Sequence, residues 1–406
     1  MKIHKKKFKV ESLIILMFSI LPIIDSINGY LVTEKKHSVG IFYKILVLLT
    51  LTFIILIKPG KISKKDLKVT ILSIMFIFFS VWTNIILGGK IISMDFPIKL
   101  VFNILTFMML MQLVKQDLVN GITFYKIFDI ATIFMIACIL IPYLLNMGYS
   151  IYGGNIGYKG FFYSQNELTA ILLILLYFSF YNLICNFSVK SLIQAGGIFL
   201  SIILTNTKSS MVACAIGAVV FLAEYLNRKE SKYKLLVISL IVVMATTTSG
   251  FVERQVVRFI TRQVTLSNTY KKSIVATITS GRSFYVMDAW ENLINDHFVG
   301  LKILIGNGFC SKILVEMDFL DMFFFLGFIG VMGYVSFCLW VYMKSKKNYR
   351  SDHTIIRKIG FLIVPAYSFL TGHIAFYATS GCYFIILCLF DMYYKTQGRD
   401  KINDLF

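Results

Sequence analysis

Cationic and acidic side chains gather in one polar segment, 250–316, and at the start of the apolar stretch that follows it. The residues concerned are Arg254, Arg258, Arg282, Glu316 and Asp318. Arginine binds phosphate oxygens through paired N–H groups, and a carboxylate within hydrogen-bonding reach can take the proton of an attacking hydroxyl. This combination predicts a site that neutralises a diphosphate leaving group while an acidic residue activates an acceptor alcohol.

Further polar candidates lie in short segments between apolar runs. They are Lys159 and Asn166 in the Gly- and Tyr-rich segment 148–167, Lys208 in the turn Asn206-Thr-Lys208-Ser-Ser, and His373 in Thr371-Gly-His373. Each would add a cation or a hydrogen-bonding group to the same surface. We therefore count all four as candidate substrate-binding residues.

Each candidate also has a purely structural interpretation. Arg254, Arg258 and Arg262 share one helical face and could belong to an interfacial helix whose guanidinium groups reach lipid head groups. Glu316 and Asp318 suit the positive N-terminal end of a helix. The lysine and histidine candidates could anchor turns or pack between helices. The sequence leaves these alternatives open.

The elements that would hold these residues follow from composition. Of 406 residues, 57% are hydrophobic and 15% are charged. Apolar runs of about 20 residues, long enough to cross a bilayer, recur along the chain. We therefore predict an all-α polytopic membrane protein that forms a single domain over 1–406. The predicted transmembrane helices, about twelve in all, are 12–32, 40–57, 69–88, 98–114, 127–147, 168–185, 192–206, 209–226, 234–249, 317–343, 359–377 and 379–394.

Charge distribution gives the orientation. Basic runs at the N-terminus, 58–68, 228–234 and 344–358 would face the cytoplasm under the positive-inside rule. Both termini are then inside, and 250–316 becomes one long extracytoplasmic loop. The net charge of +20 is accounted for by these runs and by anionic lipid, so we expect no nucleic-acid partner.

Two kinds of residue remain. The seven cysteines form no CxxC pair, so we predict no metal site, and nothing else indicates a cofactor. Asp25, in the outer half of the first span, needs a partner. It belongs either to a structural pair or to the cavity.

Several stretches together resemble the superfamily of O-antigen ligases and Wzy-type repeat-unit polymerases of bacterial envelope synthesis. The resemblance is carried by Gly160-Phe-Phe-Tyr-Ser-Gln-Asn166-Glu with Ala170, Thr205-Asn-Thr-Lys208-Ser-Ser, Ser280-Gly-Arg282 with Trp290, Gly306-Asn-Gly308, and Glu316-Met317 nine residues before Gly327-Phe-Ile-Gly330. Lysine 208 stands where the family usually has arginine. Glu316 stands where the ligases have histidine, which favours a polymerase.

The resemblance implies a metal-independent, GT-C-like glycosyltransferase in the bacterial plasma membrane. Its substrates would be undecaprenyl-diphosphate-linked oligosaccharides outside that membrane, with a flippase and a chain-length regulator as partners. Two alternatives stay open. One is a ligase of the same superfamily that attaches finished polymer. The other is a polysaccharide or small-solute transporter, although polar residues gather at the membrane boundary and not at the bilayer midplane.

Overall fold

The computed structural model describes residues 2–35, 37–57, 63–87, 94–152, 156–227, 273–309, 314–346, 355–372 and 374–394, with isolated positions between 257 and 269. Helices dominate these ranges. They are α1 (Lys2–Ser19), α2 (Leu21–Lys35), α3 (Gly40–Ile57), α4 (Lys64–Ile86), α5 (Asp95–Lys115), α6 (Gly121–Leu144), α7 (Gln165–Cys185), α8 (Val189–Thr205), α9 (Lys208–Asn227), α11 (Ile274–Ile278), α12 (Arg282–Ile294), α13 (Val299–Ile305), α14 (Asp318–Ser345), α15 (Ile355–Thr371) and α16 (Ala378–Tyr393).

A two-stranded antiparallel hairpin is the β-structure of the described ranges. Strand β1 (Ser150–Tyr152) pairs with β2 (Ile156–Tyr158), and Ser150 lies opposite Tyr158. The hairpin follows α6 and leads to the start of α7. It therefore shapes the segment that carries the first motif.

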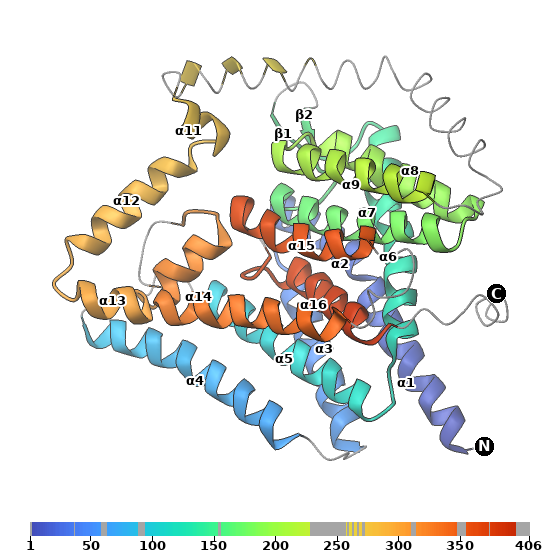
Figure 1. Cartoon of the computed structure of the whole chain (residues 1–406), viewed down its shortest axis with the longest axis horizontal. Coiled ribbons are helices and arrows are strands. Elements are labelled where there is room, and N and C mark those ends of the chain that lie inside the picture. The colour runs from blue at the N-terminus through green and yellow to red at the C-terminus, as the bar shows by residue number, and fades with distance from the viewer. Residues whose placement is uncertain are drawn as a thin grey trace.

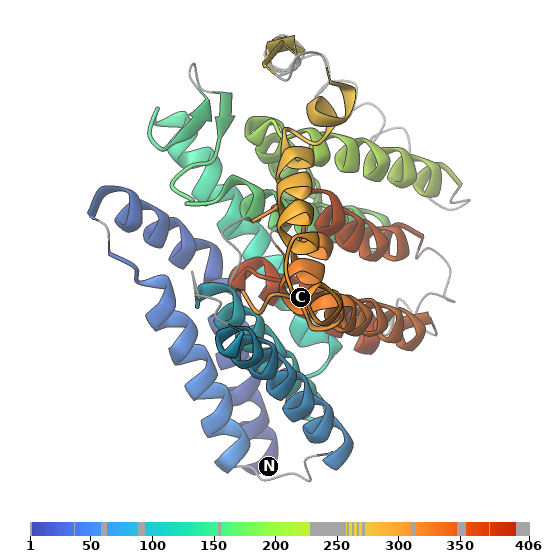
Figure 2. The same cartoon turned by 90° about the vertical axis from the view of Figure 1, so that its left-hand side faces the viewer.

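The predicted all-α, multi-pass architecture is supported. Eight helices of the described ranges are long and apolar enough to cross a membrane. The predicted span 234–249 lies outside the described residues. Each of the other predicted spans coincides with one or two helices. The start of α1 lies at the lower right in Figure 1, and α12 and α13 lie at the left, on the opposite side of the bundle. Figure 2, which faces that opposite side, shows α12 in front of the bundle.

Two predicted boundaries were wrong. The first span consists of two helices, with a turn at Ile20 just before Pro22, a residue that lacks a backbone N–H. The span predicted at 359–377 ends at Thr371 instead, because Gly372 has a φ of 64° and turns the chain away. Residues 374–377 therefore form a turn before α16.

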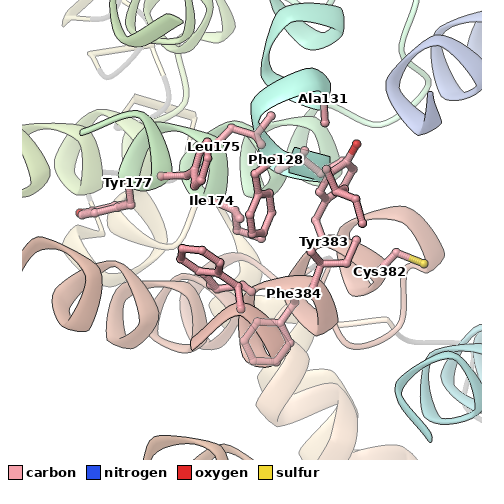
Figure 3. Packing of buried hydrophobic residues seen from close by; sticks show 14 of the residues in the cluster. Phe128, Ala131, Ile174, Leu175, Tyr177, Cys382, Tyr383 and Phe384 are labelled. Atoms are coloured by element: carbon pink, nitrogen blue, oxygen red, sulfur yellow. The ribbon is translucent and has the colours of Figure 1, made fainter. Parts of the chain in front are cut away.

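Helix α7 is the centre of the bundle. Nearly all of its side chains are buried, because it is apolar on every face. It packs against α8, α9, α15 and α16. Figure 3 shows Phe128 from α6, Ile174 and Leu175 from α7, and Tyr383 from α16 meeting in this core.

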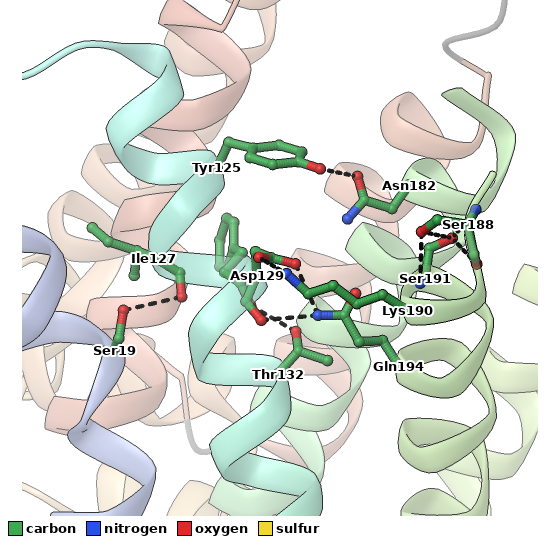
Figure 4. A network of polar contacts seen from close by, with 11 residues as sticks. Ser19, Tyr125, Ile127, Asp129, Thr132, Asn182, Ser188, Lys190, Ser191 and Gln194 are labelled. Atoms are coloured by element: carbon green, nitrogen blue, oxygen red, sulfur yellow. Dashed lines mark hydrogen bonds and ion pairs between the residues drawn. The ribbon is translucent and has the colours of Figure 1, made fainter. Parts of the chain in front are cut away.

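A polar network joins α6 to α7 and α8 (Figure 4). The Asp129 carboxylate accepts from Lys190 Nζ at 2.5 Å and from Gln194 Nε2 at 2.8 Å. The Tyr125 hydroxyl donates to Asn182 Oδ1 at 2.7 Å. These hydrogen bonds join α6 to both α7 and α8 and help to fix how the helices pack.

Helix α14 is broken at Gly327. The φ of 68° and ψ of −167° at this residue belong to a region that is essentially restricted to glycine. The backbone N–H groups of Asn307 and Gly308 donate to the carbonyls of Phe324 and Phe325 at 2.9 and 3.0 Å. The segment after α13 therefore caps the first part of α14, which explains the glycines of the Gly306-Asn-Gly308 motif structurally.

Helix α4 completes this junction. Ser80 Oγ donates to the Ile305 carbonyl at 2.7 Å, and Asn84 Nδ2 donates to the Gly306 carbonyl at 3.0 Å. A Cβ on Gly306 would lie 2.2 Å from the Phe325 carbonyl carbon. The close approach of α13, α14 and α4 thus depends on glycine at such positions.

This junction gives a test of the fold. Replacing Gly327 by alanine would strain the backbone by about 1–3 kcal/mol and place a Cβ 2.3 Å from the Leu304 carbonyl oxygen. We expect a lower thermal unfolding midpoint for purified protein in detergent. Gly333→Ala in the same helix is the control, since no atom lies within 4 Å of its Cβ position. Equal midpoints for the two variants would contradict the proposed role of the break.

Candidate functional site

Arg282 is positioned by a tight turn between α11 and α12. Ser280 and Gly281 both have positive φ, at 54° and 86°. The Gly281 N–H donates to the Ala276 carbonyl at 2.8 Å, which ends α11 and makes Arg282 the first residue of α12. The Ser-Gly pair before the arginine is therefore a requirement of the turn. Helix α12 therefore begins at the candidate residue itself.

Arg282 and Glu316 form an ion pair. Arg282 Nη2 lies 3.4 Å from Glu316 Oε2, and the two side chains are 13% and 42% exposed. The Arg282 Nε is buried and has no hydrogen-bond partner among the described residues. A buried guanidinium N–H without a partner costs free energy, and an incoming anion would remove that cost.

The backbone holds Glu316 in place just before α14. Glu316 has a φ of 61°, which few non-glycine residues adopt. A Cβ on Gly372 would lie 2.8 Å from the Glu316 carbonyl carbon, so this close packing needs a glycine at the end of α15. The sequence analysis considered Thr371 and Gly372 only because His373 follows them. In the structure, Gly372 is the residue that allows the close contact with Glu316.

Lys208 reaches the same region from α9. Its Nζ donates to the carbonyl of Thr277 in α11, one turn before Arg282. The start of α7 lies beside the turn that precedes Lys208, because the Gln165 side-chain amide donates to the Thr205 carbonyl. The basic turn and the α7 motif are therefore neighbours in the fold.

Asn166 joins this group through Tyr367 of α15. The Tyr367 hydroxyl donates to the Asn166 carbonyl at 3.4 Å. The same hydroxyl lies within the electrostatic reach of Arg282 and close to the Ser209 side chain. Tyr367 was missed by sequence reasoning, because nothing distinguishes it from the many other aromatic residues of the spans.

Asp318 has a different environment from Glu316. Its side chain is 2% exposed, and Oδ2 accepts from Ser368 Oγ at 2.5 Å and from the backbone N–H groups of Ile374 and Ala375 at 2.8 and 2.9 Å. These bonds tie the start of α14 to α15 and to the following turn. They support a positioning role for Asp318 and leave Glu316 as the acidic candidate for proton transfer.

The remaining candidates are placed as follows. Lys159 engages its own loop, with Nζ donating to the Tyr163 carbonyl at 2.6 Å and lying 5.8 Å from the Tyr163 ring centroid. Burial lowers the pKa of the Lys159 ammonium group. Arg254, Arg258 and His373 lie outside the described residues.

The structure thus brings Arg282, Glu316, Lys208 and Asn166 together from segments far apart in the sequence. Arg282 pairs with Glu316, and Lys208 is hydrogen-bonded to the helix that precedes Arg282. In the described part of the chain, no three His, Cys, Asp or Glu side chains could share a metal ion. Such an arrangement can bind a polyanion and take up a proton.

Comparisons with protein-family models, with curated proteins and with solved structures found no match.

The two acidic residues at the start of α14 can be separated by mutation. Asp318→Ala would leave two buried backbone N–H groups and a serine hydroxyl without their acceptor, at about 1–3 kcal/mol for each group. We expect a marked fall in the unfolding midpoint or loss of folded protein. Glu316→Gln keeps the size of a half-exposed side chain, and we expect a change of about 1 kcal/mol or less. Thermal unfolding of both variants in detergent measures this difference. A stable Asp318→Ala variant would contradict its positioning role.

Proposed function

We propose that the protein is a membrane glycosyltransferase that polymerises undecaprenyl-diphosphate-linked oligosaccharide repeats on the outer face of a bacterial plasma membrane. The observation that carries the proposal is the ion pair of Arg282 with Glu316, in which the buried guanidinium Nε has no partner among the described residues. Lys208 adds a second cation at the same turn. The motif segments that resemble ligases and polymerases supply all of these groups.

The proposed chemistry is a single displacement at a sugar carbon. The acceptor hydroxyl oxygen bonds to the anomeric carbon of the donor, and the bond from that carbon to the diphosphate oxygen breaks. The electron pair of that bond leaves with the lipid diphosphate, and the hydroxyl proton passes to the Glu316 carboxylate. Arg282 and Lys208 neutralise the charge that develops on the diphosphate.

The ion pair of Arg282 with Glu316 determines which step comes first, donor binding or proton transfer. A carboxylate held by a guanidinium group is a weak base, because the pairing favours its charged form. A diphosphate carries more charge than one carboxylate and would compete for Arg282. Binding of the donor therefore releases Glu316 for proton transfer. The base is activated only when the leaving group is in place.

The setting of the site supports the same proposal. Eight described helices are long and apolar enough to cross a membrane, which suits a substrate carrying a polyprenyl chain. Helix α12, which begins at Arg282, and helix α13 lie on the side of the bundle opposite the start of α1 in Figure 1. With the termini in the cytoplasm, the site faces outward. A flippase would deliver the repeats there, and a chain-length regulator would limit their number.

Glycan length in cells tests the assignment. Arg282→Ala and Glu316→Gln are each expressed in a strain whose own copy of the gene is deleted, and membrane levels are matched. We expect polymer formation to fall by about 10²–10³-fold, the usual effect of removing one charge-stabilising or proton-transferring group. Single lipid-linked repeats should then accumulate.

Lys302→Gln is the matched control. Lys302 belongs to the same polar segment, 250–316, but its Nζ pairs with Asp296 Oδ2 at 2.5 Å and not with Glu316. This variant should make polymer of normal length. Wild-type polymer from both site variants would reject the proposal. Long polymer that stays on its lipid carrier in the deletion strain would identify a ligase instead.

A further inference from the structure

A second group of ionisable side chains lies within the helix bundle, separate from Arg282. Lys44 of α3 has its Nζ 3.6 Å from Asp25 Oδ1 of α2, and the two side chains are 20% and 12% exposed. Glu167 of α7 lies within electrostatic reach of this pair, and Lys99 of α5 lies within electrostatic reach of Glu167. We call Asp25, Lys44, Lys99 and Glu167 the inner charge cluster. Charged groups within membrane helices are costly and usually mark a functional site.

The cluster has unused hydrogen-bonding capacity. The 3.6 Å separation of Lys44 and Asp25 exceeds the roughly 2.7–2.9 Å of a close charged hydrogen bond. An ammonium group has three donors and a carboxylate about four acceptor positions. Glu167 uses one oxygen to accept from the backbone N–H groups of Thr379 and Ser380, at 3.3 and 3.4 Å, at the start of α16. A ligand with both donor and acceptor groups could therefore bond to several members of the cluster.

The inner charge cluster adjoins the site of Arg282 and Glu316. Glu167 directly follows Asn166, whose carbonyl accepts from Tyr367. Tyr377, at the end of the 374–377 turn, lies within electrostatic reach of both Glu167 and Glu316. Lys99 Nζ lies 5.4 Å from the Tyr377 ring centroid. Tyr377 is therefore close to both groups of charges.

The charge balance indicates the chemistry of the ligand. The cluster holds two carboxylates and two ammonium groups, and Asp95 Oδ2 lies a further 3.6 Å from Lys99 Nζ, so positive charge is not in excess. This balance does not suit a second diphosphate, which needs excess positive charge. It suits sugar hydroxyls, which donate to carboxylates and accept from ammonium groups.

We propose that the inner charge cluster is the subsite for the acceptor saccharide. This inference rests on the proposed function, because polymerisation requires a second glycan beside the donor. Carboxylates of Asp25 and Glu167 accept from hydroxyls of the acceptor sugar, and Lys44 and Lys99 donate to its oxygens. The alternative is an ion pair that only fastens α2 to α3.

A double substitution separates the two interpretations. Asp25→Asn combined with Lys44→Met removes both charges, so that neither partner is left buried and unpaired. If the pair were only structural, the double variant would keep every binding property. The matched control is Asp66→Asn with Lys115→Met, which removes a second ion pair, between α4 and α5. Lys99→Gln is a milder variant, because the side chains of Lys99 and of its ion-pair partner Asp95 are 33% and 68% exposed.

Two probes report on the two subsites of the purified full-length protein in detergent. Undecaprenyl diphosphate probes the donor side. The oligosaccharide released by mild acid from the lipid-linked repeat that accumulates in the deletion strain probes the acceptor side. Binding is measured as a concentration-dependent shift of the unfolding midpoint. We expect the double variant and Lys99→Gln to bind the oligosaccharide at least tenfold more weakly than the wild type, with unchanged binding of undecaprenyl diphosphate.

The control double variant should bind both probes normally. Oligosaccharide binding within twofold of the wild type in the inner-cluster variants would overturn the acceptor subsite. Wild-type protein that binds undecaprenyl diphosphate but not the oligosaccharide would overturn it as well. Wild-type protein that binds no undecaprenyl diphosphate would contradict the proposed function itself, so the two failures are distinguishable. If the double variant does not fold, Lys99→Gln decides between the outcomes.

Discussion

The carboxylate of Asp318 is the interaction on which the rest of the site depends. It is buried and accepts from the Ser368 hydroxyl and from two backbone N–H groups of the turn before α16. Those bonds hold the start of α14 against the end of α15. Glu316, two residues earlier, is thereby pressed against Gly372 in a left-handed conformation, with its side chain directed at Arg282. A buried carboxylate with strong backbone partners thus helps to position the exposed carboxylate for which we propose proton transfer.

Two groups of charged side chains differ in what they offer a ligand. Arg282 has a buried Nε without a partner among the described residues, and Lys208 adds a second cation at the same turn, which suits a diphosphate. In the inner charge cluster positive charge is not in excess, which suits sugar hydroxyls. Tyr377 lies within electrostatic reach of both. A transferase that joins two glycans needs this asymmetry, because only one of its substrates loses a diphosphate in each cycle. The proposed reaction therefore follows from charge balance and position together.

Much of the architecture could be predicted from the sequence, because length and hydrophobicity are local properties. The helices at 40–57 and 165–185 illustrate this. The motif residues Arg282, Glu316, Lys208 and Asn166 could be selected by residue type, and the structure does bring them together. What could not be predicted depends on the path of the backbone. The positive φ of Gly327 and Glu316, the acceptor role of Asp318 and the pairing of Asp25 with Lys44 arise from contacts between distant segments. No periodicity or spacing reports on such contacts. Arg254, Arg258 and His373 stay predictions.

The most direct measurement is an experimental structure of the full-length protein with bound undecaprenyl diphosphate. The account predicts the diphosphate beside the start of α12, with its oxygens within hydrogen-bonding distance of the Arg282 guanidinium, including Nε, and of Lys208 Nζ. It also predicts that Glu316 no longer pairs with Arg282 and turns toward the 374–377 turn. A diphosphate bound elsewhere, with the pair of Arg282 and Glu316 intact, would contradict the account.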